Sequence, residues 1–286
     1  MAITLESATP SSLVEVVEAV AGWQHDGGGV QVHPGDFGWN WSFGAERLAK
    51  DVRFWRRDHA IVAAGMVDDD AGLIRMSIAS VVDQDEEFAQ RLLADLVGGG
   101  VMPGGVRNVE ARFGAAFREL LRRSGWADDE AWAPLVLDLA GPVTHGLRIE
   151  VVGPANVEER VAVQRAAFPT STFSLERWQA MAAAPPYRQA RCLLGYDEQG
   201  NAVAATTVWS AGPGRPGLIE PLGVHADYRG RGHGVSITRA AAAALREMGS
   251  SCATVCTPAA NVGGVAAYIA AGFERLPDAC DFRRPS

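Results

Sequence analysis

Lysine and long apolar runs are almost absent from this chain of 286 residues. Lys50 is the single lysine among 26 basic residues, and 34 acidic residues bring the formal net charge to -8. Surfaces that bind nucleic acid need clustered positive charge, so we expect no nucleic-acid partner. No apolar run approaches the roughly 20 residues that cross a bilayer, and the amino end lacks the basic and apolar regions of a signal peptide. We therefore expect a cytoplasmic protein without a membrane segment.

Cysteine is also rare. The chain has four cysteines, Cys192, Cys252, Cys256 and Cys280, and none of them forms a C-x-x-C pair. We therefore expect buried free thiols and no metal site. A hydrophobic content of 48% and a charged content of 21% are typical of a globular protein with an ample core. The length exceeds the usual single domain of about 100–200 residues and so predicts two domains.

A loop rich in glycine and arginine lies between an apolar strand, predicted over residues 218–224, and an alanine-rich helix, predicted over residues 235–248. The loop consists of Arg229, Gly230, Arg231, Gly232, His233 and Gly234. Glycines at alternate positions leave backbone N–H groups open to one anion over the first helical turn, where the helix dipole also favours negative charge. The loop therefore predicts a phosphate or pyrophosphate site. A dinucleotide fingerprint would need glycine in place of Val235, and a P-loop would need Gly-Lys-Ser/Thr, so both are excluded.

Two segments in register resemble the GNAT superfamily of acyl-CoA N-acyltransferases. Residues 224–234 resemble the pyrophosphate loop of that superfamily, with its Arg-x-x-Gly-x-Gly spacing. After a strand predicted over residues 252–256, the second segment comprises Asn261, Tyr268, Gly272 and Phe273. The resemblance implies an N-acetyltransferase that moves an acetyl group from acetyl-CoA to a primary amine of a small molecule or a peptide.

A turn-rich stretch at residues 140–146 divides the chain into two similar halves. The second half predicts strands at 147–152, 191–196 and 202–209 and helices at 157–168 and 175–184, ahead of the strand, loop, helix, strand and helix series described above. The first half follows the same order, with Ser11 or Ser12 capping its first helix. We predict an α/β fold of two tandem GNAT-like domains, residues 1–140 and 147–286, each a mixed β-sheet flanked by helices.

Glu220, on the strand that leads into the loop, is the candidate general base. Strict alternation places it on the same face as Leu218, Leu222 and Val224. A strand glutamate with an unrelated salt-bridge partner is the alternative reading, and His225 and Asp227 are the reserve candidates.

Tyr268 is the candidate general acid, because the resemblance places this tyrosine beside the thioester sulfur and a phenol can donate a proton to the leaving thiolate. The alternative for Tyr268 is simple packing against the sheet. Asn261 is either a helix N-cap or a contact to the pantetheine arm of the cofactor.

Pro221 and Gly223 are unusual in a central strand, because proline donates no ladder hydrogen bond and glycine weakens pairing. The resemblance implies that this strand bulges away from the next one and that the pantetheine arm enters the gap. Backbone N–H groups of Leu222, Gly223 and Val224 would then bind the cofactor and polarise the thioester carbonyl.

The acceptor pocket is predicted near residues 168–173, with Phe173, Trp178 and Trp209 as lining residues. The aromatic segment at residues 38–41 either reaches over that pocket or packs in a core. Two alternatives to a general N-acetyltransferase stay open: a non-catalytic acyl-CoA-binding regulatory module, and an enzyme like mycothiol synthase, a tandem GNAT protein that acetylates an amine on a thiol-bearing glycoside.

The first half is predicted to bind no acetyl-CoA. At the place of the pyrophosphate loop, residues 81–88 contain no glycine and four carboxylates, which would repel a pyrophosphate. Leu121 stands where the second half has Tyr268, counted back from Gly125 and Gly272 respectively. We expect one cofactor per chain and a first half that serves as scaffold.

Overall fold

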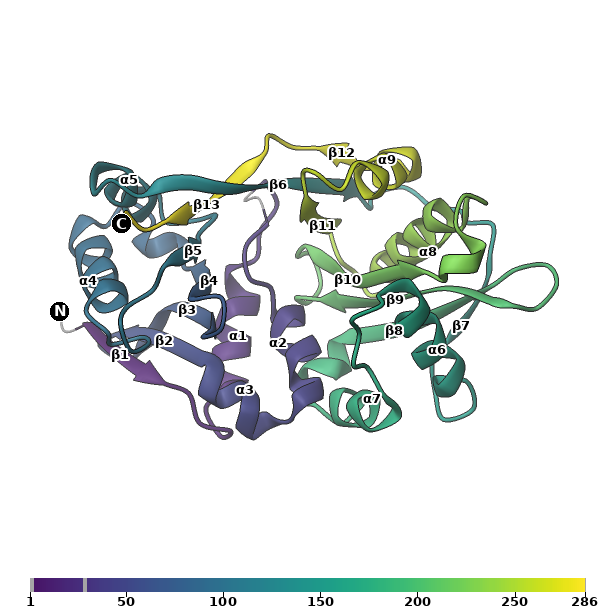
Figure 1. The fold of residues 1–286 in the computed structure, drawn as a ribbon, viewed down its shortest axis with the longest axis horizontal. Coiled ribbons are helices and arrows are strands. Elements are labelled where there is room, and N and C mark those ends of the chain that lie inside the picture. The colour runs from purple at the N-terminus through teal and green to yellow at the C-terminus, as the bar shows by residue number, and fades with distance from the viewer. Residues whose placement is uncertain (1–2, 28–29, 286) are drawn as a thin grey trace. The chain divides into compact units, whose positions relative to one another are not determined.

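The computed structural model describes residues 3–27 and 30–285, and its contacts divide the chain into two compact units (Figure 1). Unit 1 comprises the described residues of Met1–His33, Ala45–Trp132 and Pro277–Ser286. Unit 2 comprises Pro34–Gly44 and Ala133–Leu276. The division differs from the predicted boundary at 140–146, because each unit also takes a segment from the other half of the sequence.

Unit 1 is a mixed sheet with helices. Its strands are β1 (Ile3–Ser7), β2 (Val52–Arg57), β3 (Ala60–Asp68), β4 (Leu73–Ile78), β5 (Asn108–Glu110), β13 (Ala279–Arg283) and the first part of β6 (Ala127–Asp138). Its helices are α1 (Leu13–Trp23), α3 (Ala45–Asp51), α4 (Glu86–Val97), α5 (Ala115–Arg123) and the short η2 (Ser80–Val82). The strand order is β1-β2-β3-β4-β5-β13-β6, and only β4 and β5 among these neighbours pair in parallel.

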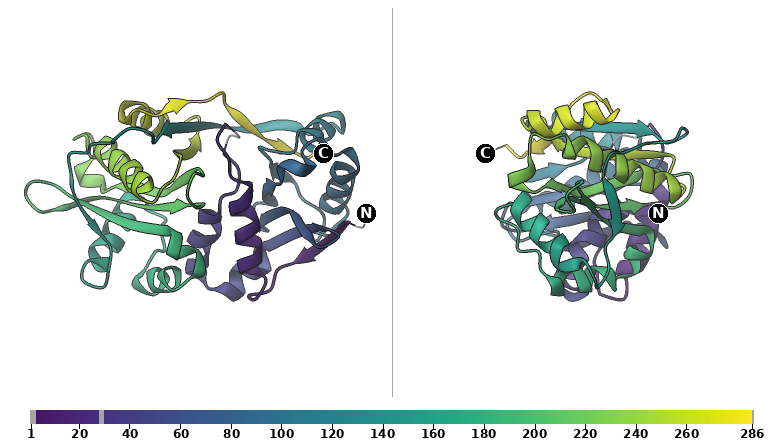
Figure 2. Two further views of the ribbon diagram at one scale, coloured as in Figure 1. Left: turned by 180° about the vertical axis from the view of Figure 1, so that it is seen from behind. Right: turned by 90° about the vertical axis from the view of Figure 1, so that its right-hand side faces the viewer.

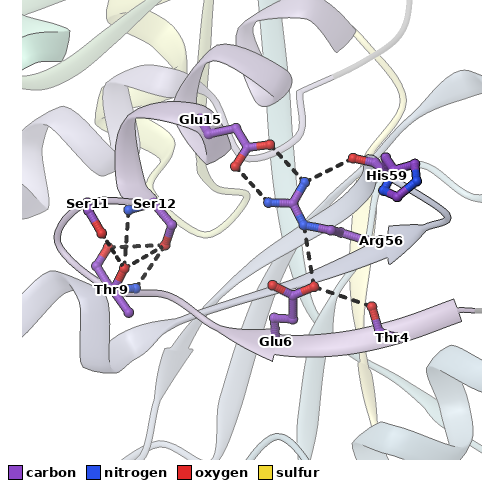
Figure 3. A network of polar contacts seen from close by, with 8 residues as sticks. All are labelled: Thr4, Glu6, Thr9, Ser11, Ser12, Glu15, Arg56 and His59. Atoms are coloured by element: carbon purple, nitrogen blue, oxygen red, sulfur yellow. Dashed lines mark hydrogen bonds and ion pairs between the residues drawn. The ribbon is translucent and has the colours of Figure 1, made fainter.

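A polar network around Arg56 joins three elements of unit 1 (Figure 3). The Arg56 guanidinium on β2 donates to both carboxylate oxygens of Glu15 on α1, at 2.8 and 2.6 Å, and lies 3.4 Å from Glu6 on β1. The predicted serine cap of α1 is wrong. Ser12 occupies the N-cap position without capping the helix, and its hydroxyl instead accepts from the backbone N–H of Thr9 at 2.9 Å.

Unit 2 repeats this plan. Its strands are β7 (Arg148–Val151), β8 (Ala190–Tyr196), β9 (Ala202–Ser210), β10 (Gly217–Val224), β11 (Cys252–Pro258), β12 (Glu274–Arg275) and the second part of β6. Its helices are α2 (Pro34–Asn40), α6 (Val157–Ala167), α7 (Leu175–Ala182), α8 (His233–Glu247), α9 (Val262–Ala271) and the short η1 (Trp41–Phe43), η3 (Pro185–Gln189) and η4 (Ala226–Tyr228). The strand order is β6-β11-β10-β9-β8-β7, with β12 beside β6.

Two apolar cores cover the two faces of the unit 2 sheet. On one face α8 contributes Ala241 and Leu245 to a cluster with Val208 and Ile219, and α9 packs beside α8 (Figure 2). On the other face α6 and α7 bury Trp209 and other side chains of β8, β9 and β10. The mixed sheets flanked by helices confirm the predicted α/β class.

Each unit contains residues from both halves of the sequence. β13, near the carboxyl end of the chain, pairs antiparallel with β5 and with the first part of β6 in unit 1. The second part of β6 pairs with β12 in unit 2. Each unit is therefore completed by residues from beyond the sequence boundary that composition predicts.

Among the described residues, no helix is both long and apolar enough to cross a membrane. In the same part of the chain, no group of three or more His, Cys, Asp or Glu residues is arranged to hold a metal ion. Cys192 and Cys252 are buried as expected, whereas Cys256 and Cys280 are partly exposed.

Candidate active site

Strand β10 leaves its regular pairing in the middle of its length. Its parallel ladder with β11 joins only Gly217 to Ala253 and Leu218 to Thr254. Its antiparallel ladder with β9 shifts register between Ile219 and Leu222, so that two residues stand opposite one on β9. Such a bulge bends a strand and interrupts its ladder. The strand therefore bulges and parts from β11, which explains why Pro221 and Gly223 are tolerated here.

The bulge overturns one prediction about Glu220. Leu218 packs in the core under α6 and α7, whereas Leu222 and Val224 pack on the opposite face with α8. Strict alternation fails because the extra residue in the bulge reverses the side on which the later side chains lie. Leu218 and the pair Leu222 and Val224 therefore lie on opposite faces, so Glu220 cannot share a face with all three. Glu220 lies in the bulge, between Ile219 and Leu222.

The predicted anion loop has the backbone of an anion-binding turn. Gly230 and Gly232 have φ angles of 76° and 82°, in the left-handed region that favours glycine. Gly232 is the N-cap of α8, and no side chain caps this helix end. The first N–H groups of α8 therefore keep their capacity to donate to an anion, and the helix dipole favours negative charge there. A Cβ at either glycine would meet no atom within 4 Å, so the space over the loop is open.

The two arginines of the loop have different positions. Arg229 donates to the backbone carbonyl of Ala167 at the end of α6, at 2.8 Å. Arg231 donates to the carbonyl of Asp227 at 3.1 Å, and its guanidinium lies 5.2 Å from the centre of the Tyr228 ring. Arg229 thus ties the loop to α6, while Arg231 folds over the outer side of the loop.

The segment of α9 that carries Tyr268 lies beside the start of α8 and the end of β10. A methyl group at Gly234, the second residue of α8, would be 3.7 Å from Val224 at the end of β10 and 3.8 Å from Ala267 on α9. These contacts bring together the helix start, the strand end and the residue that precedes Tyr268. Burial, and next the negative charge of Glu220, raise the pKa of the Tyr268 phenol above its usual value.

Asn261 is the N-cap of α9. Its side-chain oxygen accepts from the N–H of Gly264 at 3.1 Å, and its amide donates to Thr257 at 3.0 Å. Asn261 thus caps α9, which is the simpler of its two predicted roles.

Close packing of β10 against the end of α6 requires glycine at position 223. A Cβ at this position would lie 2.6 Å from the Cβ of Ala167 and 2.8 Å from the Phe168 ring. Only glycine allows the end of α6 to come this near the strand. Leu222 and Val224, on either side of it, pack toward α8.

The structure buries the three residues predicted to line the acceptor pocket. Phe173 is 0%, Trp178 9% and Trp209 1% exposed, all within the core under α6 and α7. Trp39 stacks on Phe173 with ring centres 5.1 Å apart, so the aromatic segment at 38–41 packs in this core.

His225 and Asp227, the reserve candidates for the general base, border a cavity of about 340 Å³ together with residues of α6 and of the β8–β9 turn. The other lining residues are Glu159, Ala162, Val163, Asn201, Ala202 and Tyr228.

The matching part of unit 1 is filled by its own carboxylates. Asp85 caps α4 by accepting from the N–H of Phe88 at 2.8 Å and pairs with Arg57 at 2.7 Å. Asp83 accepts from the N–H groups of Gly114 and Ala115 at the start of α5, at 3.1 and 2.9 Å. Both helix starts therefore already hold an anion, in contrast to the uncapped start of α8.

The family described as Acetyltransferase (GNAT) family matches residues 157–273, which include the loop and Tyr268. No curated protein sequence matches the chain.

Three solved structures share the fold along the whole chain. A GNAT-family acetyltransferase from Colwellia psychrerythraea has a TM-score of 0.64 at 15% identity, with 100% of both chains covered. A tandem GNAT protein from the clavulanic acid biosynthesis pathway has a TM-score of 0.55 at 14% identity, again with 100% of both chains covered. A GCN5-related N-acetyltransferase from Sphaerobacter thermophilus has a TM-score of 0.54 at 15% identity, with 99% of this chain and 95% of the other covered. The predicted fold of two tandem GNAT-like domains is thereby confirmed. Residues 157–273 thus match the GNAT acetyltransferase family, and the chain shares its fold with GNAT-family proteins along its whole length.

Proposed function

We propose that unit 2 transfers an acetyl group from acetyl-CoA to a primary amine of a small molecule or a peptide by direct attack. The observation that carries this proposal is the interrupted ladder of β10, which carries Glu220, beside the uncapped start of α8 and the segment of α9 that carries Tyr268. A base and an acid on these neighbouring segments are what amine acylation by direct attack requires.

The uncapped start of α8 fits the pyrophosphate of the co-substrate. The N–H groups that follow Gly232 would hold the phosphates, and Arg231 adds a permanent positive charge at the loop. Arg229 would act by tying the loop to Ala167. The freed backbone of Leu222, Gly223 and Val224 would hold the pantetheine arm and donate to the thioester carbonyl.

Glu220 would accept the proton of the attacking amine, directly or through a water molecule. An alkyl amine with a pKa near 10.4 is mostly protonated at neutral pH, and exposing its lone pair costs about 4–5 kcal/mol. A carboxylate at the strand bulge would share that proton and lower this cost. The nitrogen then bonds to the acetyl carbon as the carbon–sulfur bond breaks.

Tyr268 would donate its phenolic proton, or a strong hydrogen bond, to the sulfur that leaves. The raised pKa of this phenol keeps it protonated throughout the neutral range. The proton donor is therefore available at neutral pH.

We further propose that unit 1 binds no acetyl-CoA and serves as a scaffold. Asp85 already caps α4, the helix whose start corresponds to the predicted pyrophosphate site of α8. Leu121, fully buried, stands in place of a catalytic tyrosine. The proposal thus assigns one active site to each chain.

Release of free thiol from acetyl-CoA across a panel of primary amines tests the proposed reaction. We expect release that depends on both an amine and the enzyme, with one acetylated amine formed for each thiol. Tight binding of acetyl-CoA without thiol release for any amine would instead indicate a non-catalytic acyl-CoA-binding module. A reaction restricted to amines on thiol-bearing glycosides would indicate the narrower, mycothiol-synthase-like activity.

A further inference from the structure

Trp209 contacts the backbone of the proposed base from inside the core. Its side chain is 1% exposed, and its indole Nε1 donates to the carbonyl oxygen of Glu220 at 2.8 Å. Trp209 lies on β9, opposite Leu218, so the indole reaches along the strand to the bulge. A bulge interrupts the regular ladder, and here an indole N–H supplies a hydrogen bond to the strand at that point.

Helix α2 fixes the position of the indole. A Cβ at Gly35 or at Gly38 would overlap the Trp209 ring, so both glycines lie directly against it. On another side, the Tyr187 ring stands nearly perpendicular to the indole, with ring centres 6.1 Å apart. The indole is thus packed between α2 and Tyr187.

Helix α2 comes from the first half of the sequence, although it packs in unit 2. Two glycines within its seven residues are poor helix formers. The close approach to Trp209 gives a physical reason for glycine at positions 35 and 38, because any larger residue would push the indole away.

We infer that Trp209 is a positioning residue for catalysis and that Gly35 and Gly38 set its place. The indole holds the Glu220 backbone at the bulge and thereby orients the carboxylate toward the amine. This inference rests on the proposed role of Glu220 as general base. It also gives the first half of the chain a direct part in the reaction, through α2.

Two variants test the inference. Trp209→Phe keeps an aromatic ring in the core and removes the N–H donor. Gly38→Ala keeps the indole and displaces it. We expect each to lower kcat about tenfold, within the range that a misplacement of about one ångström produces, while acetyl-CoA affinity stays the same. Gly22→Ala on α1, where an added Cβ meets no atom within 4 Å, is the matched control and should keep full activity.

A double-mutant cycle separates positioning from general stability. If Trp209 acts through Glu220, Trp209→Phe should cause no further loss of kcat in a Glu220→Gln enzyme. A variant with a lower melting temperature and unchanged kcat, or losses that multiply in the double variant, would overturn the inference.

The contact itself is tested by NMR in the absence of substrates. The Trp209 indole N–H signal, assigned by its loss in Trp209→Phe, should exchange slowly with solvent and shift in Gly38→Ala. Rapid exchange in the native protein would overturn the contact. An unimpaired Glu220→Gln enzyme would overturn the role of Glu220 as base and with it the catalytic part of the inference, so the two failures are distinguishable.

Discussion

Replacing Tyr268 by phenylalanine removes one hydroxyl group and leaves the ring in place. The ring packs against the core under α8, and its centre lies 5.9 Å from that of Phe273. Neither contact needs the hydroxyl, so we expect little change in the free energy of unfolding. If the phenol is the general acid, kcat should fall about 10²-fold, which corresponds to about 2.7 kcal/mol of transition-state stabilisation.

The pH dependence of this loss is part of the prediction. Burial and Glu220 raise the pKa of the Tyr268 phenol, so it is protonated throughout the range from about pH 6.5 to 9. The loss of kcat in Tyr268→Phe should therefore be nearly constant across that range. A thiol such as that of CoA has a reference pKa near 8.5, below that of the phenol, so in the proposed mechanism Tyr268 would stabilise the thiolate mainly through a shared proton.

Thiol release at saturating acetyl-CoA and amine measures this effect. Tyr196→Phe is the matched control, since Tyr196 is a buried tyrosine on β8 whose phenol also has a raised pKa, of about 12. Unchanged kcat in a folded Tyr268→Phe enzyme would refute the reasoning and leave Tyr268 as a packing residue. An equal loss of kcat in Tyr268→Phe and Tyr196→Phe would likewise refute a catalytic role for Tyr268.

Three further changes have defined outcomes. Glu220→Gln should lower kcat most near pH 7 and progressively less toward pH 10, where the amine needs no base; a loss that is uniform across pH would indicate a structural role. Gly223→Ala should destabilise the protein by about 1–3 kcal/mol in urea unfolding, because the new methyl group would lie 2.6 Å from the Cβ of Ala167; an unchanged unfolding midpoint would contradict the close packing. Asp85→Ala should cost about 1 kcal/mol of unfolding free energy at neutral pH. The hydrogen bond from Arg57 holds the pKa of Asp85 below its usual value, so this contribution is present above that value and is lost as the pH falls through the lowered one; a difference between wild type and variant that persists in strong acid would contradict this origin.

The loop and its flanking elements could be predicted from the sequence because their signals are local. Glycines at 230 and 232 must adopt left-handed backbone angles, and the helix after them begins within two residues of the predicted position. The order of strands and helices in both halves follows from the same kind of local pattern.

Features that depend on tertiary contacts were missed or misplaced. The face of Leu222 and Val224 was wrong because one extra residue in the bulge breaks the alternation. Helix α2 was not predicted, because its two glycines disfavour a helix and are explained only by their contact with Trp209. β6 contributes to both units, and β13, from the second half of the sequence, completes the sheet of unit 1. Both features depend on long-range strand pairing, which no local pattern specifies.

Calorimetric titration of the intact chain with acetyl-CoA is the most direct test of the proposed active site. The proposed function requires one molecule bound per chain and loss of that binding in Gly232→Asp, which places a negative charge at the start of α8. Gly200→Asp is the matched control, because Gly200 has nearly the same φ, 83°, and the same open surroundings in the turn between β8 and β9. Full affinity in a folded Gly232→Asp protein, or a second molecule bound to the native chain, would contradict the assignment of the active site to unit 2.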